Sequence, residues 1–220
     1  MDPLSRYDPT RNNLLVISIK SFLIGIVFTL ATILEFYNTS YTSIFLYLQF
    51  ICLFHSLEFI LTYIYNNSEI DDDSFILEDK ELHFINIASI IEFLINPIKI
   101  HTIFGGVLLL IIGQFIRSYS MIIAKENFNH YIQKQTNKNH KLVDYGIYRY
   151  IRHPSYLGFF VWFIGLQLIL GNIIILVVGS IILWKFFKDR IKFEEEYLIK
   201  FFGNDYVEYK NSTSTWMFIS

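Results

Sequence analysis

The sequence predicts an all-α, polytopic integral membrane protein with about six transmembrane helices, two of which form a short helical hairpin. Apolar residues make up 53% of its 220 residues and charged residues only 17%, which leaves too few charges to cover a water-facing domain. Apolar runs of about 20 residues, the length that crosses roughly 30 Å of hydrocarbon, recur along the chain. The mean hydropathy of +0.40 also indicates a membrane protein. A net charge of −2 argues against a nucleic-acid partner, and a single cysteine argues against a disulfide scaffold.

We expect one membrane domain over residues 1–220, with four spans in its N-terminal part. The four apolar runs cover residues 14–37, 43–65, 82–100 and 103–123. The first run is longer than a signal-peptide core and no small-residue cleavage pattern follows it closely, so we expect it to be a retained span. The third run is the weakest, because Glu92, Asn96 and Pro97 interrupt it, and a re-entrant path is the alternative to a full crossing.

The apolar run over residues 156–184 is too long for one ordinary span. Gly171 and Asn172 break it near its middle, which predicts two short helices joined by a tight turn. Basic residues gather on both sides of this hairpin, because twelve of the 18 Lys and Arg lie in residues 124–155 or after Trp184. By the positive-inside rule, both segments and the N-terminus lie in the cytoplasm, which an even number of spans satisfies.

Several well-known site motifs are absent from the sequence. The chain has no G-x-G-x-x-G, no phosphate-binding glycine loop, no H-E-x-x-H and no C-x-x-C. We therefore expect neither a soluble nucleotide-binding fold nor a metal site.

A dense polar and aromatic block runs across an expected membrane boundary between His140 and Gly158. It holds two His, four Tyr and two Arg. Pro154 pushes His153 away from helical geometry, so the block is expected to form a shaped loop that enters a span near Tyr156. An interfacial belt of anchoring aromatic residues is the plainer interpretation, but this density of polar groups favours a binding site.

Arg190 and Glu194 form a second candidate site. They are four residues apart, so they share one face of a helix. This spacing fits an ordinary surface ion pair and a ligand site equally well. In a ligand site, Arg190 would bind a carboxylate and Glu194 a cationic or hydroxyl-rich group.

Ionisable residues also fall inside the expected spans, where each is costly unless paired, and packing pairs between helices are their commoner explanation. These residues are His55, Glu58, Glu92 and Arg117.

Taken together, these segments resemble the isoprenylcysteine carboxyl methyltransferase family. The likeness rests on residues 140–158, on the R-x-x-x-E-E pattern that begins at Arg190, and on F-F-G-N-D-Y-V-E-Y-K over residues 201–210. It extends upstream through residues 127–130 and 55–58. The R-H-P-S-Y-x-G element alone is less specific, because sterol reductases and related membrane methyltransferases carry a similar one.

The resemblance implies an enzyme of the endoplasmic-reticulum membrane that methylates the C-terminal carboxylate of a farnesylated or geranylgeranylated cysteine, the last step of CaaX maturation. Its cofactor would be S-adenosylmethionine, held in a cytosol-facing pocket of a catalytic half, residues 124–220, made of a cytoplasmic loop, the hairpin and a cytoplasmic C-terminal helix and tail. Its partners would be membrane lipid and prenylated CaaX proteins, such as Ras-like GTPases or a lipidated peptide pheromone. Arg190 would contact the substrate carboxylate. The donor-binding positions would be Gln133, His140, Lys141, Leu142, Val143, Tyr148, His153, Pro154, Ser155, Tyr156 and Glu194.

Two other functions stay open from the sequence. One keeps the methyl donor and changes the acceptor to a phospholipid amine. The other is a transporter built around the broken helix at residues 171–172. Transporters usually consist of paired repeats, and the sequence shows no internal repeat.

Overall fold

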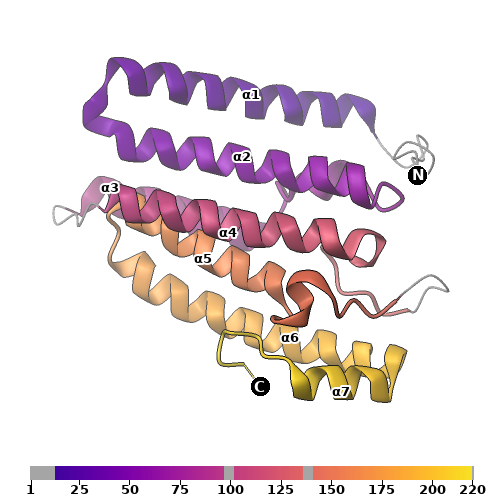
Figure 1. Ribbon diagram of the computed structural model, residues 1–220. Helices are drawn as coiled ribbons and strands as arrows, with labels where there is room; N and C mark the ends of the chain where they lie inside the picture. The colour runs from indigo at the N-terminus through magenta and orange to yellow at the C-terminus, as the bar shows by residue number, and fades with distance from the viewer. Residues whose placement is uncertain (1–12, 97–101, 136–140, 220) are drawn as a thin grey trace.

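The computed structural model describes residues 13–96, 102–135 and 141–219. Within these ranges the chain is helical and has no β-strand, which confirms the all-α fold class. The long helices run alongside one another, and α7 lies beside the end of α6 (Figure 1). The α-helices are α1 (Leu14–Tyr37), α2 (Thr42–Tyr65), α3 (Lys80–Ile95), α4 (Ile103–Ala124), α5 (Pro154–Leu170), α6 (Ser180–Phe202) and α7 (Asn204–Ser212).

The helices lie where the sequence predicts apolar runs, but their lengths differ. α3 has 16 residues and α5 has 17, which is short for a full crossing. The number of spans therefore stays a prediction, and Pro97, which was expected to interrupt the third span, lies outside the described residues. The described helices that are long and apolar enough to cross a bilayer are Leu14–Tyr37, Thr39–Tyr65 and Ile103–Asn127.

The predicted hairpin has its turn at the expected place. α5 ends at Leu170 and is capped by Gly171, whose φ of 71° is a left-handed conformation that glycine adopts without strain. The prediction that the second arm is a separate short helix ending near Trp184 was wrong. The chain passes through a π-helical turn, Ile175–Gly179, directly into α6, which continues to Phe202. Because α6 contains neither Gly nor Pro, nothing in its backbone ends the helix where the side chains become polar.

Glu92 fixes the turn of this hairpin from α3. Its carboxylate accepts the backbone N–H groups of Ile173, Ile174 and Ile175, each at 2.7 Å. The first turn of a helix leaves such N–H groups without an intrahelical partner, and a negative charge is favourable there. Glu92 thus caps the helix that follows the turn and joins it to α3. For this residue a packing contact between helices, not a functional site, explains the charge inside an expected span.

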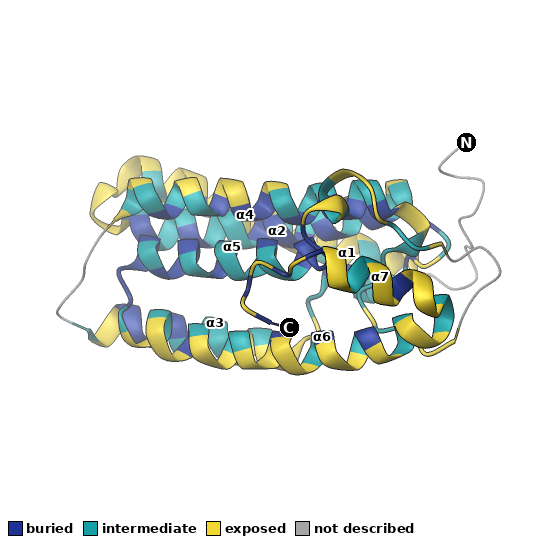
Figure 2. Cartoon of the chain, turned by 60° about the horizontal axis from the view of Figure 1, so that its bottom comes forward, coloured by how far each residue is buried: buried dark blue, intermediate teal, exposed yellow. Residues whose placement is uncertain are grey.

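The core lies between α2, α4 and α5. Figure 2 shows buried residues on the sides of these helices that face one another and exposed residues along the outer faces. Tyr47, Phe54, Trp162 and Leu166 are each no more than 3% exposed. α1, all of whose residues are described, buries only Ala31 and otherwise presents apolar side chains outward. Apolar outer faces of this kind suit a protein whose surroundings are lipid.

Glycines hold α4 and α5 in close contact. Gly106 and Gly113 on α4 face Gly165 and Gly158 on α5. A Cβ atom built on Gly113 would lie 2.6 Å from the carbonyl oxygen of Gly158, and one on Gly106 would lie 2.9 Å from that of Gly165. Small residues let helices approach closely in a bilayer, where little else drives them together. This contact places the first turn of α5 against α4.

Gly113→Ala is expected to destabilise the protein by about 1–3 kcal/mol, because the added methyl group overlaps backbone atoms of α5. Thermal unfolding in detergent micelles measures the change. Gly105→Ala is the matched control, since no atom lies within 4 Å of a Cβ atom built at Gly105. Equal unfolding midpoints for the two variants would contradict the close packing of α4 on α5.

Candidate active site

Tyr156, in the first turn of α5, connects the two charged residues predicted on α6. Its hydroxyl donates to Oε2 of Glu194 at 2.6 Å and accepts from Nε of Arg190 at 2.9 Å. The guanidinium also lies over the Tyr156 ring, with Cζ 5.6 Å from the ring centroid. Arg190 and Glu194 therefore share one helix face, as their spacing predicts, and they meet through the Tyr156 hydroxyl.

Aromatic rings line one side of these charges. The His153 ring stacks on Tyr156 with centroids 5.6 Å apart, and Tyr156 stacks on Phe187 at 5.1 Å. Nδ1 of His153 lies 3.8 Å from Oε2 of Glu194. His153 has φ −129° and ψ 61°, so the predicted departure from helical geometry before Pro154 is confirmed.

Pro154 and Ser155 have different surroundings from Tyr156. Pro154 is the first residue of α5, where its missing N–H costs nothing and its fixed φ favours the helix. The Ser155 hydroxyl accepts from Nη1 of Arg117 at 3.1 Å. The Ser155 side chain therefore contacts the interior of the bundle, next to α4.

The loop after α4 holds the other predicted donor-binding residues. The Lys141 N–H donates to the Asn127 side chain at 2.9 Å, and the Tyr148 hydroxyl donates to the Ser120 carbonyl at 3.4 Å. Burial raises the pKa of Tyr148, and the negative charge of Glu194 adds to the rise. His140 lies outside the described residues. Gln133, Leu142 and Val143, which were also predicted to bind the donor, are half-buried.

A buried cluster of charges around Glu195 was missed by the sequence analysis. Its carboxylate accepts from Nε of Arg152 at 2.7 Å and from Nε2 of His153 at 3.0 Å, and Nζ of Lys210 lies 2.7 Å from its second oxygen. Burial alone would raise the pKa of the Glu195 carboxyl, but the hydrogen bonds from His153, Lys210 and Arg152 outweigh it and hold that pKa well below its usual range. Glu195 thus stays ionised and fixes the His153 ring beside the site.

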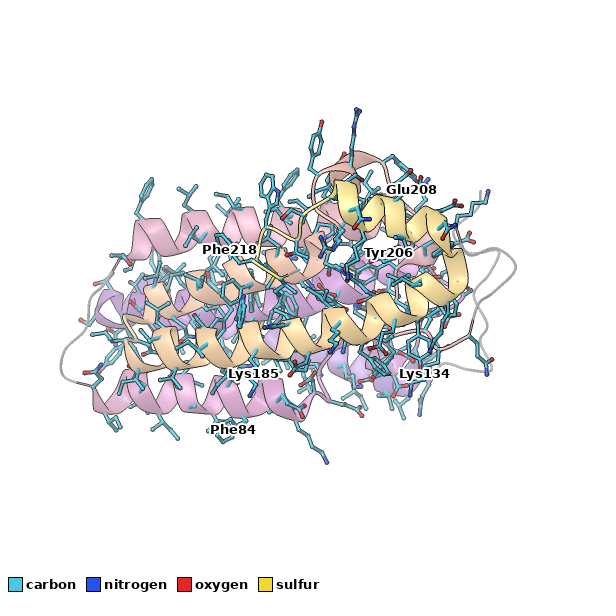
Figure 3. All side chains as sticks on the ribbon, turned by 90° about the horizontal axis from the view of Figure 1, so that it is seen from below. Phe84, Lys134, Lys185, Tyr206, Glu208 and Phe218 are labelled. Carbon is cyan, nitrogen blue, oxygen red and sulfur yellow. The ribbon has the colours of Figure 1, made fainter. Side chains whose placement is uncertain are left out.

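Arg152 also attaches the C-terminal tail, residues 213–219, to this cluster. Its Nη1 and Nη2 donate to the carbonyls of Thr213 at 2.5 Å and Ile219 at 3.2 Å. Nε1 of Trp184 on α6 donates to the carbonyl of Met217 at 2.7 Å. Figure 3 looks onto the face that carries α6, α7 and the tail. The tail is therefore a fixed part of the surface beside the site.

The structure has two cavities that neither Arg190 nor Glu194 lines. One, of about 450 Å³, lies between α3 and the start of the second hairpin arm and has an apolar lining that includes Ile91 and Ile174. The other, of about 540 Å³, lies between Arg152 and the tail. Neither is the cofactor pocket expected from the sequence, which stays a prediction.

Comparison with known proteins identifies the family of this chain. The profile of the isoprenylcysteine carboxyl methyltransferase family matches residues 106–200. A protein-S-isoprenylcysteine O-methyltransferase of Saccharomyces cerevisiae is 36% identical over 219 residues, which cover 93% of this chain and 91% of that protein. The chain belongs to the isoprenylcysteine carboxyl methyltransferase family. The resemblance inferred from the sequence is confirmed.

Further relatives of the isoprenylcysteine carboxyl methyltransferase family extend the match. Proteins with the same name are 38% identical in Schizosaccharomyces pombe, over 74% of this chain and 78% of that protein, and 36% identical in Homo sapiens, over 90% and 73%. A solved structure, described as the eukaryotic intramembrane Ras methyltransferase, superimposes with a TM-score of 0.85 at 30% identity and covers 93% of this chain and 77% of its own. Tyr156, Arg190 and Glu194 lie within residues 106–200, the range of this chain that the family profile matches.

Proposed function

We propose that this protein transfers a methyl group from S-adenosylmethionine to the C-terminal carboxylate of a prenylated cysteine. The observation that carries the proposal is the arrangement of Arg190 and Glu194 around the Tyr156 hydroxyl, at the first turn of an apolar helix. A cation suited to a carboxylate, an anion suited to a cationic donor and an apolar surface suited to lipid meet at this point. The names of the relatives agree with this reaction.

The acceptor in this reaction needs no general base. A C-terminal carboxyl has a pKa of about 3.3–3.7, so it is already an ionised nucleophile near neutral pH. Arg190 can hold both oxygens of a planar carboxylate, and Tyr156 and the carbonyl of His130 hold its guanidinium in turn. The protein then contributes by orienting one carboxylate oxygen toward the methyl group and by excluding water.

The residues around Glu194 fit the methyl donor. When bound, S-adenosylmethionine supplies an electrophilic methyl group on a sulfonium cation. The stacked rings of His153 and Tyr156 border the place proposed for this cation, beside the Glu194 carboxylate. The Glu194 side chain is 29% exposed, and its contacts with Tyr156 and His153 use Oε2, so that Oε1 can accept from an ammonium group or a ribose hydroxyl. The loop residues predicted to bind the donor complete the proposed site.

An apolar surface beside Tyr156 suits the prenyl chain. Phe187 of α6 and Met217 of the C-terminal tail form a buried cluster there, and the apolar side chains packed around it are only partly buried, among them Leu157, Phe160 and Leu183. A substrate whose carboxylate lies at Arg190 can therefore lay its lipid along α5 and α6 without leaving the bilayer.

The same proposal places the enzyme in the endoplasmic-reticulum membrane with six spans and its site in the cytosol. Four spans would lie within residues 14–123 and the catalytic half within residues 124–220. Its substrates would be prenylated CaaX proteins, such as Ras-like GTPases or a lipidated peptide pheromone. The clustering of Lys and Arg on both sides of the hairpin supports this orientation.

An assay with labelled donor tests the reaction. Membranes that contain the protein are incubated with labelled S-adenosylmethionine and either N-acetyl-S-farnesylcysteine or phosphatidylethanolamine. We expect base-labile label in the farnesylated cysteine, as a methyl ester requires. Label that appears only in the phospholipid would replace this proposal with the phospholipid amine as acceptor, and no label in either would overturn methyl transfer.

Glu194→Gln is expected to weaken donor binding about tenfold, because a charge-assisted hydrogen bond to the donor becomes a neutral one. Titration of the purified protein with S-adenosylmethionine measures this. Glu196→Gln, an exposed site on the same helix, is the matched control and is expected to bind the donor as the wild type does. Unchanged affinity in Glu194→Gln would refute its contact with the donor.

A further inference from the structure

A buried ion pair joins α2 and α4 inside the bundle. Nη2 of Arg117 donates to Oε2 of Glu58 at 2.9 Å, and Nε of Arg117 donates to Oε1. The Glu58 side chain is 0% exposed and that of Arg117 is 9% exposed. The guanidinium also lies 5.2 Å from the centroid of Phe54 and 5.4 Å from that of Phe159. Both charges are costly in an apolar setting unless they are paired in this way.

Glu58 has a second partner, and this one lies outside the helices. Nε2 of His130, in the loop after α4, donates to Oε2 of Glu58 at 2.7 Å. The same loop is tied to the end of α2 by Asn66, whose side chain donates to the carbonyl of Phe128 at 2.8 Å. The loop thus rests on α2 at two points, one of them a charged group at full burial.

The backbone of His130 contacts the proposed active site. Its carbonyl accepts from Nη2 of Arg190 at 2.5 Å, while Nε of Arg190 is held by the Tyr156 hydroxyl at 2.9 Å. Two bonds to different nitrogens fix both the position and the plane of a guanidinium. The further N–H groups of Arg190 can then meet a carboxylate at a defined angle, which bidentate binding requires.

We propose that His130, anchored by Glu58, is a positioning residue that orients Arg190 toward the carboxylate of the substrate. This inference rests on the proposed function. A carbonyl in an irregular loop holds a fixed place only if the loop itself is fixed. The bond from the His130 ring to Glu58 supplies that constraint, because Glu58 is itself held by Arg117 inside the bundle.

The test compares two ligands that differ only in the carboxylate. N-acetyl-S-farnesylcysteine is the methyl acceptor, and its carboxamide, which cannot form the charged pair with Arg190, is expected to compete with it. In His130→Ala we expect the KM for the acid to rise about tenfold, with the inhibition constant of the amide and the KM for S-adenosylmethionine within twofold of the wild type. His130→Gln is expected to recover most of the loss, because its amide nitrogen can take the place of Nε2.

Tyr47→Phe is the matched control. Tyr47 lies on α2, as Glu58 does, is 0% exposed and donates its hydroxyl hydrogen bond to the Asn86 side chain of α3 at 2.9 Å. This bond joins α2 to α3, whereas the contact of His130 joins α2 to the loop after α4. We expect Tyr47→Phe to lower the unfolding midpoint without changing the ratio between acid and amide binding.

Three results would each overturn the positioning role. In His130→Ala, binding of the acid and of the amide could weaken equally, or the ratio between acid and amide binding could stay at its wild-type value. In His130→Gln, the KM for the acid could fail to recover. Should His130→Ala fail to accumulate, Glu58→Asp gives the same test, since it keeps the charge beside Arg117 and withdraws the carboxylate from His130. A wild-type enzyme that transfers no label to the acid would overturn the proposed function itself, whereas one that methylates the acid but binds acid and amide equally would overturn the contact of Arg190 with the carboxylate and this inference with it. A wild type that discriminates while the His130 variants discriminate equally well would overturn only this inference.

Discussion

Arg190→Lys is expected to lower kcat/KM for the farnesylated acceptor about 100-fold while the amount of protein in the membrane stays unchanged. Arg190 binds the Tyr156 hydroxyl and the His130 carbonyl, and in the proposed reaction it holds the substrate carboxylate as well. A lysine ammonium is a point charge without a planar fork, so it cannot keep these bonds and a bidentate grip at once. The loss of one charge-assisted hydrogen bond costs about 1.5–3 kcal/mol, which corresponds to roughly 10- to 100-fold in rate.

A matched exchange on the same helix separates this effect from a general change in α6. Lys192→Arg alters an exposed basic residue two positions away and is expected to leave activity within twofold of the wild type. Initial rates with labelled donor, normalised to protein quantified by immunoblot, provide the comparison. Near-normal activity in Arg190→Lys would show that the carboxylate is held elsewhere.

Much of the fold could be predicted because the bilayer fixes the length of an apolar run. The first apolar run gave both ends of α1, and the fourth gave α4 to within one residue at its end. α6 could not be delimited in the same way, since its polarity changes near Lys185 while its backbone stays helical. Hydropathy indicates whether lipid or water surrounds a helix, whereas glycine, proline and capping residues indicate where the helix begins and ends.

The site was predictable only in part, for a related reason. The spacing of Arg190 and Glu194 is local, so helix geometry alone placed them on one face. Arg152 and Glu195 are 43 positions apart, and Glu58 and Arg117 are 59 apart. Their pairing depends on which helices pack against each other, and the spacing of residues along the sequence does not predict that. The available signal was the cost of an unpaired charge in a span, which requires a partner for Glu58 but does not identify it.

Glu58→Leu is expected to destabilise the protein by about 3–5 kcal/mol, because it leaves the guanidinium of Arg117 buried without its carboxylate partner. The double variant Glu58→Leu/Arg117→Met is expected to recover most of this loss, since a well-packed apolar pair avoids burying either charge. Thermal unfolding of the single and double variants in detergent gives the coupling between the two positions. Additive losses would contradict a direct ion pair.

The double variant also separates stability from positioning. It restores an apolar contact between α2 and α4 but offers no carboxylate to His130, so the loop stays unanchored near Arg190. We therefore expect a protein that unfolds close to the wild-type midpoint and still shows the raised KM for the acid that His130→Ala shows. A double variant with wild-type stability and wild-type KM would mean that Glu58 serves packing alone.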